Sequence, residues 1–183
     1  MKDLIILKFG GTSVSRASDN IFSIVKKYSL EYKNVVIVFS AFSGITNLLY
    51  RITERLNPIK WNLVKLLKQM QKSFYKRLFK SETSLKHLDE LLDNVYNQLK
   101  ESLESLLTIN KDWPENKKKD LIVGYGEKIS ALVYQQFFIE NELDAFYVPA
   151  EDLIKTNSYY QNAFPDMVAT SNLIEKNLVP LLK

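Results

Sequence analysis

The stretch from Leu4 to Ser13, LIILKFGGTS, joins an apolar run to two glycines and two hydroxyl residues. A second apolar run, VVIVF at residues 35–39, leads into Ser40 and a loop that reaches Gly44. Continuous runs of this kind are typical of strands buried on both faces of a parallel sheet. The residues that recur at helical spacing between the two runs are Ile21, Phe22, Val25, Tyr28 and Tyr32. The pattern predicts a strand–helix–strand unit.

Helical spacing of apolar residues dominates the rest of the chain. Helices are expected at about residues 46–56, 60–80, 85–107 and 117–141, and again from about residue 166. One more apolar run, from Ala145 to Val148, predicts a third buried strand that ends at Pro149. The predicted fold class is α/β, a sandwich centred on a parallel sheet, with an α-helical insert at residues 58–116.

The insert contains the two predicted helices at residues 60–80 and 85–107. Apolar residues of the second helix step by three and four, which is the seam spacing of a coiled coil. They are Leu85, Leu88, Leu92, Val95 and Leu99. Because the run covers only about three heptads, it favours an antiparallel helical hairpin packed on the domain. A coiled coil that binds a partner is the alternative.

The composition excludes several kinds of site. The 183 residues include no cysteine and one histidine, so disulfides, thiolate metal sites, cysteine nucleophiles and multi-histidine metal centres are excluded. The net charge of +4 is weak evidence for nucleic-acid binding, because most lysines lie on predicted solvated helix faces. No apolar run reaches the roughly 18 residues of a membrane span. The apolar run near the start of the chain is too short to be the core of a signal peptide. We expect a cytoplasmic protein without nucleic-acid or membrane partners.

Lys8, Gly10 and Gly11 come at the end of the first predicted strand. The carboxyl edge of a parallel sheet is where such folds bind phosphates. Glycines allow backbone N–H groups to approach phosphate oxygens, and a lysine there offsets the charge that develops in phosphoryl transfer. A phosphate site is therefore one interpretation of this segment. A simple tight turn is the other, because the segment is neither a P-loop nor a dinucleotide fingerprint.

Ser40 and Thr46 follow the second predicted strand, and Thr46 lies at the start of a predicted helix. Hydroxyls and free amides at a helix N-terminus form an anion site. The alternative is that Thr46 is only the N-cap of its helix. Since both strand ends face one crevice, we expect the two segments to share a site.

Glu127 lies on the helix face opposite the apolar stripe of residues 122–137. Gly124 and Ala131 flank it on that face and leave room for a ligand. A glycine inside a helix lowers helix stability by about 1 kcal/mol, so the presence of Gly124 and Gly126 calls for an explanation. Glu127 is either a binding residue or an exposed surface glutamate.

Three segments together resemble the aspartate kinase family, within the amino-acid kinase fold. They are KFGGTSV at residues 8–14, VFSAFSGITNLL at residues 38–49 and GEKISA at residues 126–131. Weaker similarity continues from Lys155 to Asp166. The resemblance follows the whole chain in order and is loose only across the insert.

The resemblance implies a role for each matching residue. Lys8 would be catalytic and contact the ATP phosphates, with Gly10 and Gly11 in the phosphate loop. The residues that would bind aspartate are Ser40, Thr46, Glu127 and Tyr160. Glu127 would pair with the α-ammonium group of the substrate. ATP and Mg²⁺ are the implied cofactors, and no residue is assigned to the metal.

The implied reaction transfers the γ-phosphoryl group of ATP to the β-carboxylate of L-aspartate and yields 4-phospho-L-aspartate. This is the first step towards lysine, threonine and methionine. An aspartate carboxylate has a reference pKa of about 3.9 and is ionised near neutral pH, so the reaction needs no general base. Positioning and charge neutralisation then account for catalysis.

The family continues beyond these motifs with a nucleotide-binding half and, usually, ACT domains. We therefore expect residues 1–183 to be the N-terminal substrate-binding portion of the kinase domain, inactive in isolation, within a homo-oligomer. Two alternatives stay open. One is another kinase of the same fold that acts on glutamate or acetylglutamate, and the other is a non-catalytic interaction module built on the helical hairpin.

Overall fold

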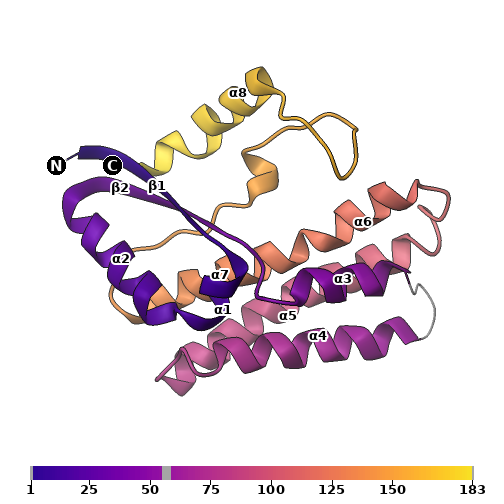
Figure 1. Cartoon of the computed structure of the whole chain (residues 1–183), viewed down its shortest axis with the longest axis horizontal. Coiled ribbons are helices and arrows are strands. Elements are labelled where there is room, and N and C mark those ends of the chain that lie inside the picture. The colour runs from indigo at the N-terminus through magenta and orange to yellow at the C-terminus, as the bar shows by residue number, and fades with distance from the viewer. Residues whose placement is uncertain (1, 55–58, 183) are drawn as a thin grey trace.

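The structure, a computed structural model, describes residues 2–54 and 59–182. Its elements are mostly helices. In chain order they are β1 (Lys2–Phe9), α1 (Gly11–Arg16), α2 (Ser18–Glu31), β2 (Tyr32–Phe39), α3 (Ile45–Glu54), α4 (Ile59–Tyr75), α5 (Glu82–Ser105), α6 (Glu115–Val123), α7 (Tyr125–Glu140) and α8 (Met167–Asn177), with 3-10 turns η1 (Ala150–Asp152) and η2 (Val179–Leu181) (Figure 1).

The strand–helix–strand prediction is confirmed. β1 and β2 run parallel in register, with Lys8 opposite Val38 and Phe9 opposite Phe39. The expectation that both faces of these strands are buried is wrong. Leu7 and Phe9 pack on the core, whereas Ile6 is 64% and Val38 48% exposed. Side chains alternate across a strand, and α2 and α7 pack against the inward-facing set.

The predicted third strand at Ala145–Val148 is also wrong. This segment is extended, but in the described part of the chain the sheet consists of β1 and β2 only. A strand exists only where a neighbouring strand accepts and donates its ladder hydrogen bonds. Here the carbonyl of Ala145 instead accepts from the side-chain amide of Gln135 on α7, at 3.3 Å. The run follows α7 and does not join the sheet.

The helices lie near the predicted positions, with three differences: α1 was not predicted, α4 ends at Tyr75 and not at residue 80, and one predicted helix is divided. The helix predicted at residues 117–141 is divided into α6 and α7 at Gly124. An added Cβ at Gly126 would lie 2.8 Å from the Cβ of Ala41 and 3.3 Å from Cγ2 of Ile45. Gly126 is therefore needed because α7 begins in close contact with the loop before α3 and with α3 itself. The predicted end of the α3 helix at residues 55–56 and the start of the insert at residue 58 lie outside the described residues.

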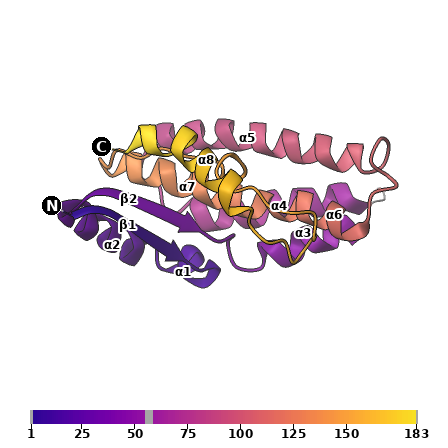
Figure 2. The same cartoon turned by 90° about the horizontal axis from the view of Figure 1, so that it is seen from above.

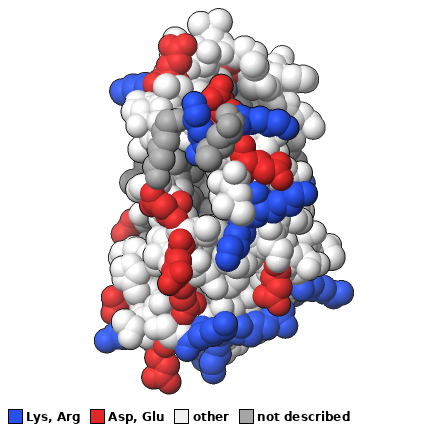
Figure 3. Space-filling model, turned by 90° about the vertical axis from the view of Figure 1, so that its left-hand side faces the viewer, with Lys and Arg blue, Asp and Glu red and all other residues white. Residues whose placement is uncertain are grey.

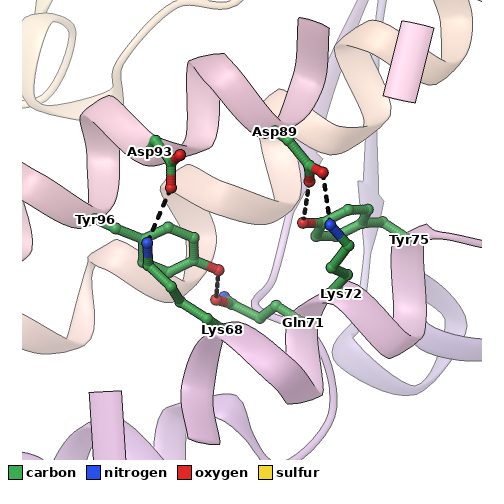
Figure 4. A network of polar contacts seen from close by, with 7 residues as sticks. All are labelled: Lys68, Gln71, Lys72, Tyr75, Asp89, Asp93 and Tyr96. Carbon is green, nitrogen blue, oxygen red and sulfur yellow. Dashed lines mark hydrogen bonds and ion pairs between the residues drawn. The ribbon is translucent and has the colours of Figure 1, made fainter. Parts of the chain in front are cut away.

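α4 and α5 form the predicted antiparallel hairpin. Lys68 pairs with Asp93 at 2.9 Å and Lys72 with Asp89 at 2.6 Å, so earlier residues of α4 face later residues of α5 (Figure 4). Tyr75 donates to Asp89 at 2.8 Å in the same network. α4 packs on α3 and α5 packs on α7, so the hairpin is attached to the body of the domain along both helices.

The core lies between the hairpin, α3, α7 and the inner face of the sheet. Tyr134 of α7 is fully buried and stacks on Phe39 of β2, with ring centroids 4.5 Å apart. Figures 1 and 2 show α7 running beside the strands, and Figure 1 shows α8 on the side of the molecule away from α4. This arrangement brings the carboxyl ends of β1 and β2 next to the start of α7.

The helices and the surface charges bear on whether the chain spans a membrane or contacts a nucleic acid. Within residues 2–54 and 59–182, no helix combines the length and apolar character needed to cross a membrane. On the face shown in Figure 3, acidic and basic side chains are interspersed. The net charge of +4 is thus not gathered into one continuous basic surface on that face.

Candidate active site

Two loops meet where β1 and β2 end. The first contains Gly10 and Gly11, and the second runs from Ser40 to Gly44. The backbone N–H of Ser40 donates to the carbonyl of Phe9 at 3.1 Å, which extends the pairing of the strands by one residue. A Cβ added to Gly11 would lie 2.7 Å from the carbonyl oxygen of Ala41. Gly11 is therefore required by the contact between the two loops.

Gly10 differs from Gly11 in what surrounds it. Among residues 2–54 and 59–182, the only neighbour that an added Cβ would meet within 4 Å is the ammonium nitrogen of Lys8, at 3.9 Å. Lys8 itself is exposed at the end of β1. The lysine charge thus lies beside an open stretch of backbone. This is the arrangement expected where an anionic group approaches the chain.

Thr46 is the second residue of α3. The N–H of Leu48 donates to the carbonyl of Gly44 at 3.1 Å, so the helix begins after Gly44, and Thr46 is not its N-cap. Gly44 has φ of 82°, a conformation that glycine adopts without strain. The turn at Gly44 carries the chain from β2 into α3, so Thr46 lies in the first turn of the helix beside the loop of Ser40.

Glu127 lies in the first turn of α7 and points towards the second loop. Its Oε1 accepts from the backbone N–H of Ala41 at 3.4 Å. Its Oε2 is buried and has no hydrogen-bond partner among the described residues. The idea of an exposed surface glutamate is therefore wrong, because α7 is buried around most of its circumference and Tyr134 lies on the same side.

A buried carboxylate oxygen without a donor is costly, because it loses its hydrogen bonds to water and gains none from the protein. A cationic or N–H-bearing ligand would restore the missing interaction. Glu127 is thus the residue of this site whose environment most clearly calls for a ligand.

Ser130 connects α7 to the second loop. Its hydroxyl is fully buried and lies 2.9 Å from the carbonyl of Ser40 and 3.0 Å from the carbonyl of Glu127. These contacts fix the start of α7 against the end of β2. The structure therefore brings Lys8, Gly10, Gly11, Ser40, Thr46 and Glu127 to one edge of the sheet.

Tyr160 lies apart from this group. The ammonium of Lys117 is 5.8 Å from its ring centroid and 3.6 Å from that of Trp113. The adjacent N–H of Gln161 donates to Asp120 at 2.8 Å. Lys117 precedes Glu127 by ten residues along α6 and α7, about 15 Å at helical rise. A contact of Tyr160 with aspartate stays a prediction.

Three residues of the site were not found by sequence reasoning. Ser15 bonds to both loops, Arg77 bonds to Ser15, and Ser130 bonds to Ser40. Ser130 lies inside a segment already singled out, but its hydroxyl had no distinguishing neighbour in sequence. Arg77 is separated from Ser15 by 62 residues, so no local pattern could connect them.

Comparison with known proteins places these features in a family. A model of the amino acid kinase family matches residues 3–183. Lysine-sensitive aspartokinase 3 of Escherichia coli is 28% identical over 190 residues, which cover 100% of this chain and 39% of that protein. An aspartokinase of Candida albicans is 29% identical over 181 residues, covering 88% of this chain and 31% of the relative.

Two solved structures that this chain resembles are also of an aspartokinase. E. coli aspartokinase III in complex with lysine and aspartate superposes with a TM-score of 0.80 at 26% identity, covering 97% of this chain and 38% of the other. The same enzyme in complex with aspartate and ADP has a TM-score of 0.78 at 25% identity, covering 99% and 38%. The chain thus spans less than two fifths of the length of these relatives.

Proposed function

Because the chain belongs to the amino acid kinase family, we propose that the protein containing it is an aspartate kinase. It would transfer the γ-phosphoryl group of ATP to the β-carboxylate of L-aspartate and produce 4-phospho-L-aspartate for lysine, threonine and methionine synthesis. The proposal concerns the whole protein, since the chain spans 39% of the E. coli relative. We assign residues 1–183 to the substrate-binding portion of the kinase domain.

The observation that carries the proposal is the Oε2 of Glu127, which is buried and has no hydrogen-bond partner in the described part of the chain. The Glu127 carboxylate lies beside Ala41, in the loop between β2 and α3 that begins at Ser40 and leads to Thr46. The α-ammonium group of an amino acid has the charge and the donors to satisfy this oxygen. Thr46, in the first turn of α3, is close in sequence to that loop and offers a hydroxyl to a carboxylate of the same substrate.

Lys8 and Gly10 form the phosphate side of the proposed site. The lysine ammonium next to open backbone fits the β- and γ-phosphates of ATP. As the substrate carboxylate attacks the γ-phosphorus, negative charge spreads over the transferred oxygens, and Lys8 offsets it. The attacking carboxylate is already ionised, so the residues of this chain need to bind, orient and neutralise charge, and none has to remove a proton.

Magnesium would accompany ATP, as in other phosphoryl transfers. In the described ranges, 2–54 and 59–182, no three His, Cys, Asp or Glu residues gather to hold a metal ion. Magnesium bound through ATP phosphates needs only one or two protein carboxylates, and we derive no step through the ion. We further propose that the protein works in the cytoplasm as a homo-oligomer.

The test compares two variants in the full-length protein that contains this chain. Glu127→Gln keeps the shape of the side chain and removes its charge. Loss of one member of a buried charge pair costs about 2–5 kcal/mol, so the Kd for aspartate should rise by about 30-fold or more. Lys8→Ala should instead lower kcat by about 10²–10³-fold.

Isothermal titration with aspartate and ATP, together with steady-state kinetics, separates the two effects. Glu31→Gln, at an exposed position on α2, is the matched control and should behave as the wild type. A Glu127→Gln protein that binds aspartate normally would remove the basis of the proposal. A wild-type protein that phosphorylates glutamate or acetylglutamate in preference to aspartate would assign it to another reaction of the same family.

A further inference from the structure

Ser15 links the two loops of the proposed site through one hydroxyl group. Its Oγ donates to the carbonyl of Gly11 at 2.8 Å, within α1, and accepts from the N–H of Ser43 at 2.7 Å, which joins α1 to the Ser40–Gly44 loop. Ser15 is 5% exposed, so water does not compete effectively for these bonds. The phosphate side and the aspartate side of the site are therefore joined at this residue.

Arg77 contacts the same residue from the helical hairpin. It lies in the turn that follows α4, and its Nη2 donates to the carbonyl of Ser15 at 2.9 Å. The last carbonyls of a helix have no intrahelical partner, and a cation there is favourable. Arg77 thus satisfies the carboxyl end of α1, the helix that begins at Gly11.

A second side chain holds the neighbouring carbonyl. The hydroxyl of Tyr134 on α7 donates to Val14 at 2.8 Å, and the bond is buried. α1 has six residues, too few to be stable without outside contacts. Besides its contacts with α2 and with Ser43, α1 is therefore held by one residue of α7 and one residue of the hairpin.

We propose that Arg77 is a positioning residue for phosphoryl transfer, which holds α1 and, through Ser15, fixes the Gly10–Gly11 loop relative to the Ser40–Gly44 loop. The inference rests on the proposed kinase function. Lys8 belongs to β1 and Glu127 to α7, so each retains its own support without Arg77. Loss of Arg77 therefore changes the distance between the bound phosphate and the attacking carboxylate more than the binding of either substrate.

The physical consequence is a separation of kcat from affinity. Misplacement of reacting groups by about 1 Å, caused by a change away from the chemistry, can cost about 10²-fold in rate. We expect Arg77→Ala to lower kcat by about 10–100-fold in the full-length protein. The Kd values for aspartate and ATP should change by less than about threefold, since neither substrate touches Arg77 in the proposed site.

The experiment includes three comparisons besides the wild type. Arg77→Lys keeps the charge but loses the planar donor group, and should have an intermediate kcat. Lys76→Ala removes the adjacent exposed cation and should leave kcat unchanged. Added guanidinium chloride at millimolar concentration should raise the kcat of Arg77→Ala and not that of Lys8→Ala, because it can reoccupy only the first position.

The outcomes separate the inference from the proposed function. If the wild-type protein has no aspartate kinase activity, the proposed function fails. If the wild type is active and Arg77→Ala retains its kcat, the positioning role is refuted and the function stands. A fall in kcat that only parallels a lower Tm, with no response to guanidinium, would likewise refute it. A fall in kcat at unchanged Tm and unchanged Kd values supports it.

Discussion

The helical hairpin and the C-terminal segment use apolar residues in similar number but bury them very differently. In the hairpin, Leu67, Leu88 and Leu99 are fully buried against α3, α7 and each other's helices. In the segment from residue 145 to residue 182, Phe146, Phe164 and Val168 are 65%, 69% and 75% exposed. The apolar surface of the hairpin is thus covered within this chain, whereas that of the C-terminal segment is not.

The two regions also differ in what attaches them to the molecule. The hairpin is held by packing and by the charged network of Figure 4. The C-terminal segment is attached by scattered polar contacts, such as the N–H of Gln161 donating to Asp120 and the ion pair of Glu151 with Lys128. Regions with few buried apolar contacts open at low free energy. We therefore expect α8 to open locally while the hairpin unfolds only with the core.

The largest expected effect is on the free energy of unfolding after truncation of a buried leucine. Leu99→Ala should lower it by about 2–5 kcal/mol, because the cavity cannot collapse fully between α5 and α7. Val168→Ala, the matched change in α8, should alter it by less than about 0.5 kcal/mol. Urea unfolding followed by circular dichroism measures both. Equal losses for the two variants would remove the distinction between the regions.

A second prediction concerns the close packing of Gly126 at the proposed site. Gly126→Ala should lower the free energy of unfolding by about 1–3 kcal/mol, because its new Cβ would lie 2.8 Å from that of Ala41. Gly10→Ala has open space and should be close to neutral for stability. The same urea measurement tests both variants. A stable Gly126→Ala protein would mean that α7 can shift away from the second loop.

The third prediction uses alkaline pH. Burial, with a hydrogen bond to Asp89, raises the pKa of Tyr75 in the hairpin well above its ordinary value of 10. Because the folded state holds the Tyr75 proton more tightly than the unfolded state, the contribution of Tyr75 to stability is complete below about pH 10. This contribution is lost as the pH rises further. In the C-terminal segment, burial raises the pKa of Tyr147 only to about 12.

Alkaline titration should therefore show two kinds of tyrosine. Tyr147 should ionise without loss of helix, whereas ionisation of Tyr75 should coincide with unfolding of the hairpin. Ultraviolet absorbance of tyrosinate, recorded together with circular dichroism, distinguishes them. In Tyr75→Phe the dependence of stability on pH above about pH 10 should become shallower. An unchanged slope would show that Tyr75 does not contribute.

The smallest effect is expected at a contact that attaches the C-terminal segment to α7. Glu151 pairs with Lys128 of α7 at 2.7 Å. Partial burial opposes ionisation of Glu151, but hydrogen bonds from Lys128 and from its own backbone outweigh it and lower the pKa. The contribution is present above the unfolded pKa of about 4.3 and is lost as pH falls through the lower folded value.

Because the Glu151 side chain is 60% exposed, solvent screens the pair and its contribution should stay below about 1 kcal/mol. Glu151→Gln should accordingly reduce stability slightly at pH 7 and not at all at pH values below the folded pKa. Urea midpoints across this range measure the difference. Glu31→Gln provides the control, and a larger loss for that variant would contradict the assignment.

Much of the fold followed from local patterns. The parallel strand–helix–strand unit, the hairpin and the start of α3 were all indicated by runs or periodicities of a few residues. Such patterns record which face of an element is buried, and they are set by neighbours along the chain. The motifs at the two strand ends and at Glu127 were found in the same way, since each occupies one short segment.

Local patterns could not specify which elements pack against each other in the folded chain. The run at Ala145–Val148 has the composition of a strand, yet it lies along α7. Tyr160 belongs to a motif by sequence, yet its ring lies over Lys117. The extended and helical preferences of these segments are satisfied in either location, so pairing and docking decide the outcome.

The sequence by itself determined β1, β2, the positions of most helices and the residue types that suit phosphate and amino-acid binding. The tertiary structure alone decided that Gly126 must be small, that Oε2 of Glu127 lacks a partner within the residues the structure describes, and that Arg77 reaches Ser15. The physical reason is the separation of these contacts along the chain. Hydrogen bonds and close packing between residues 62 or 86 positions apart depend on the folded geometry, and no local spacing encodes them.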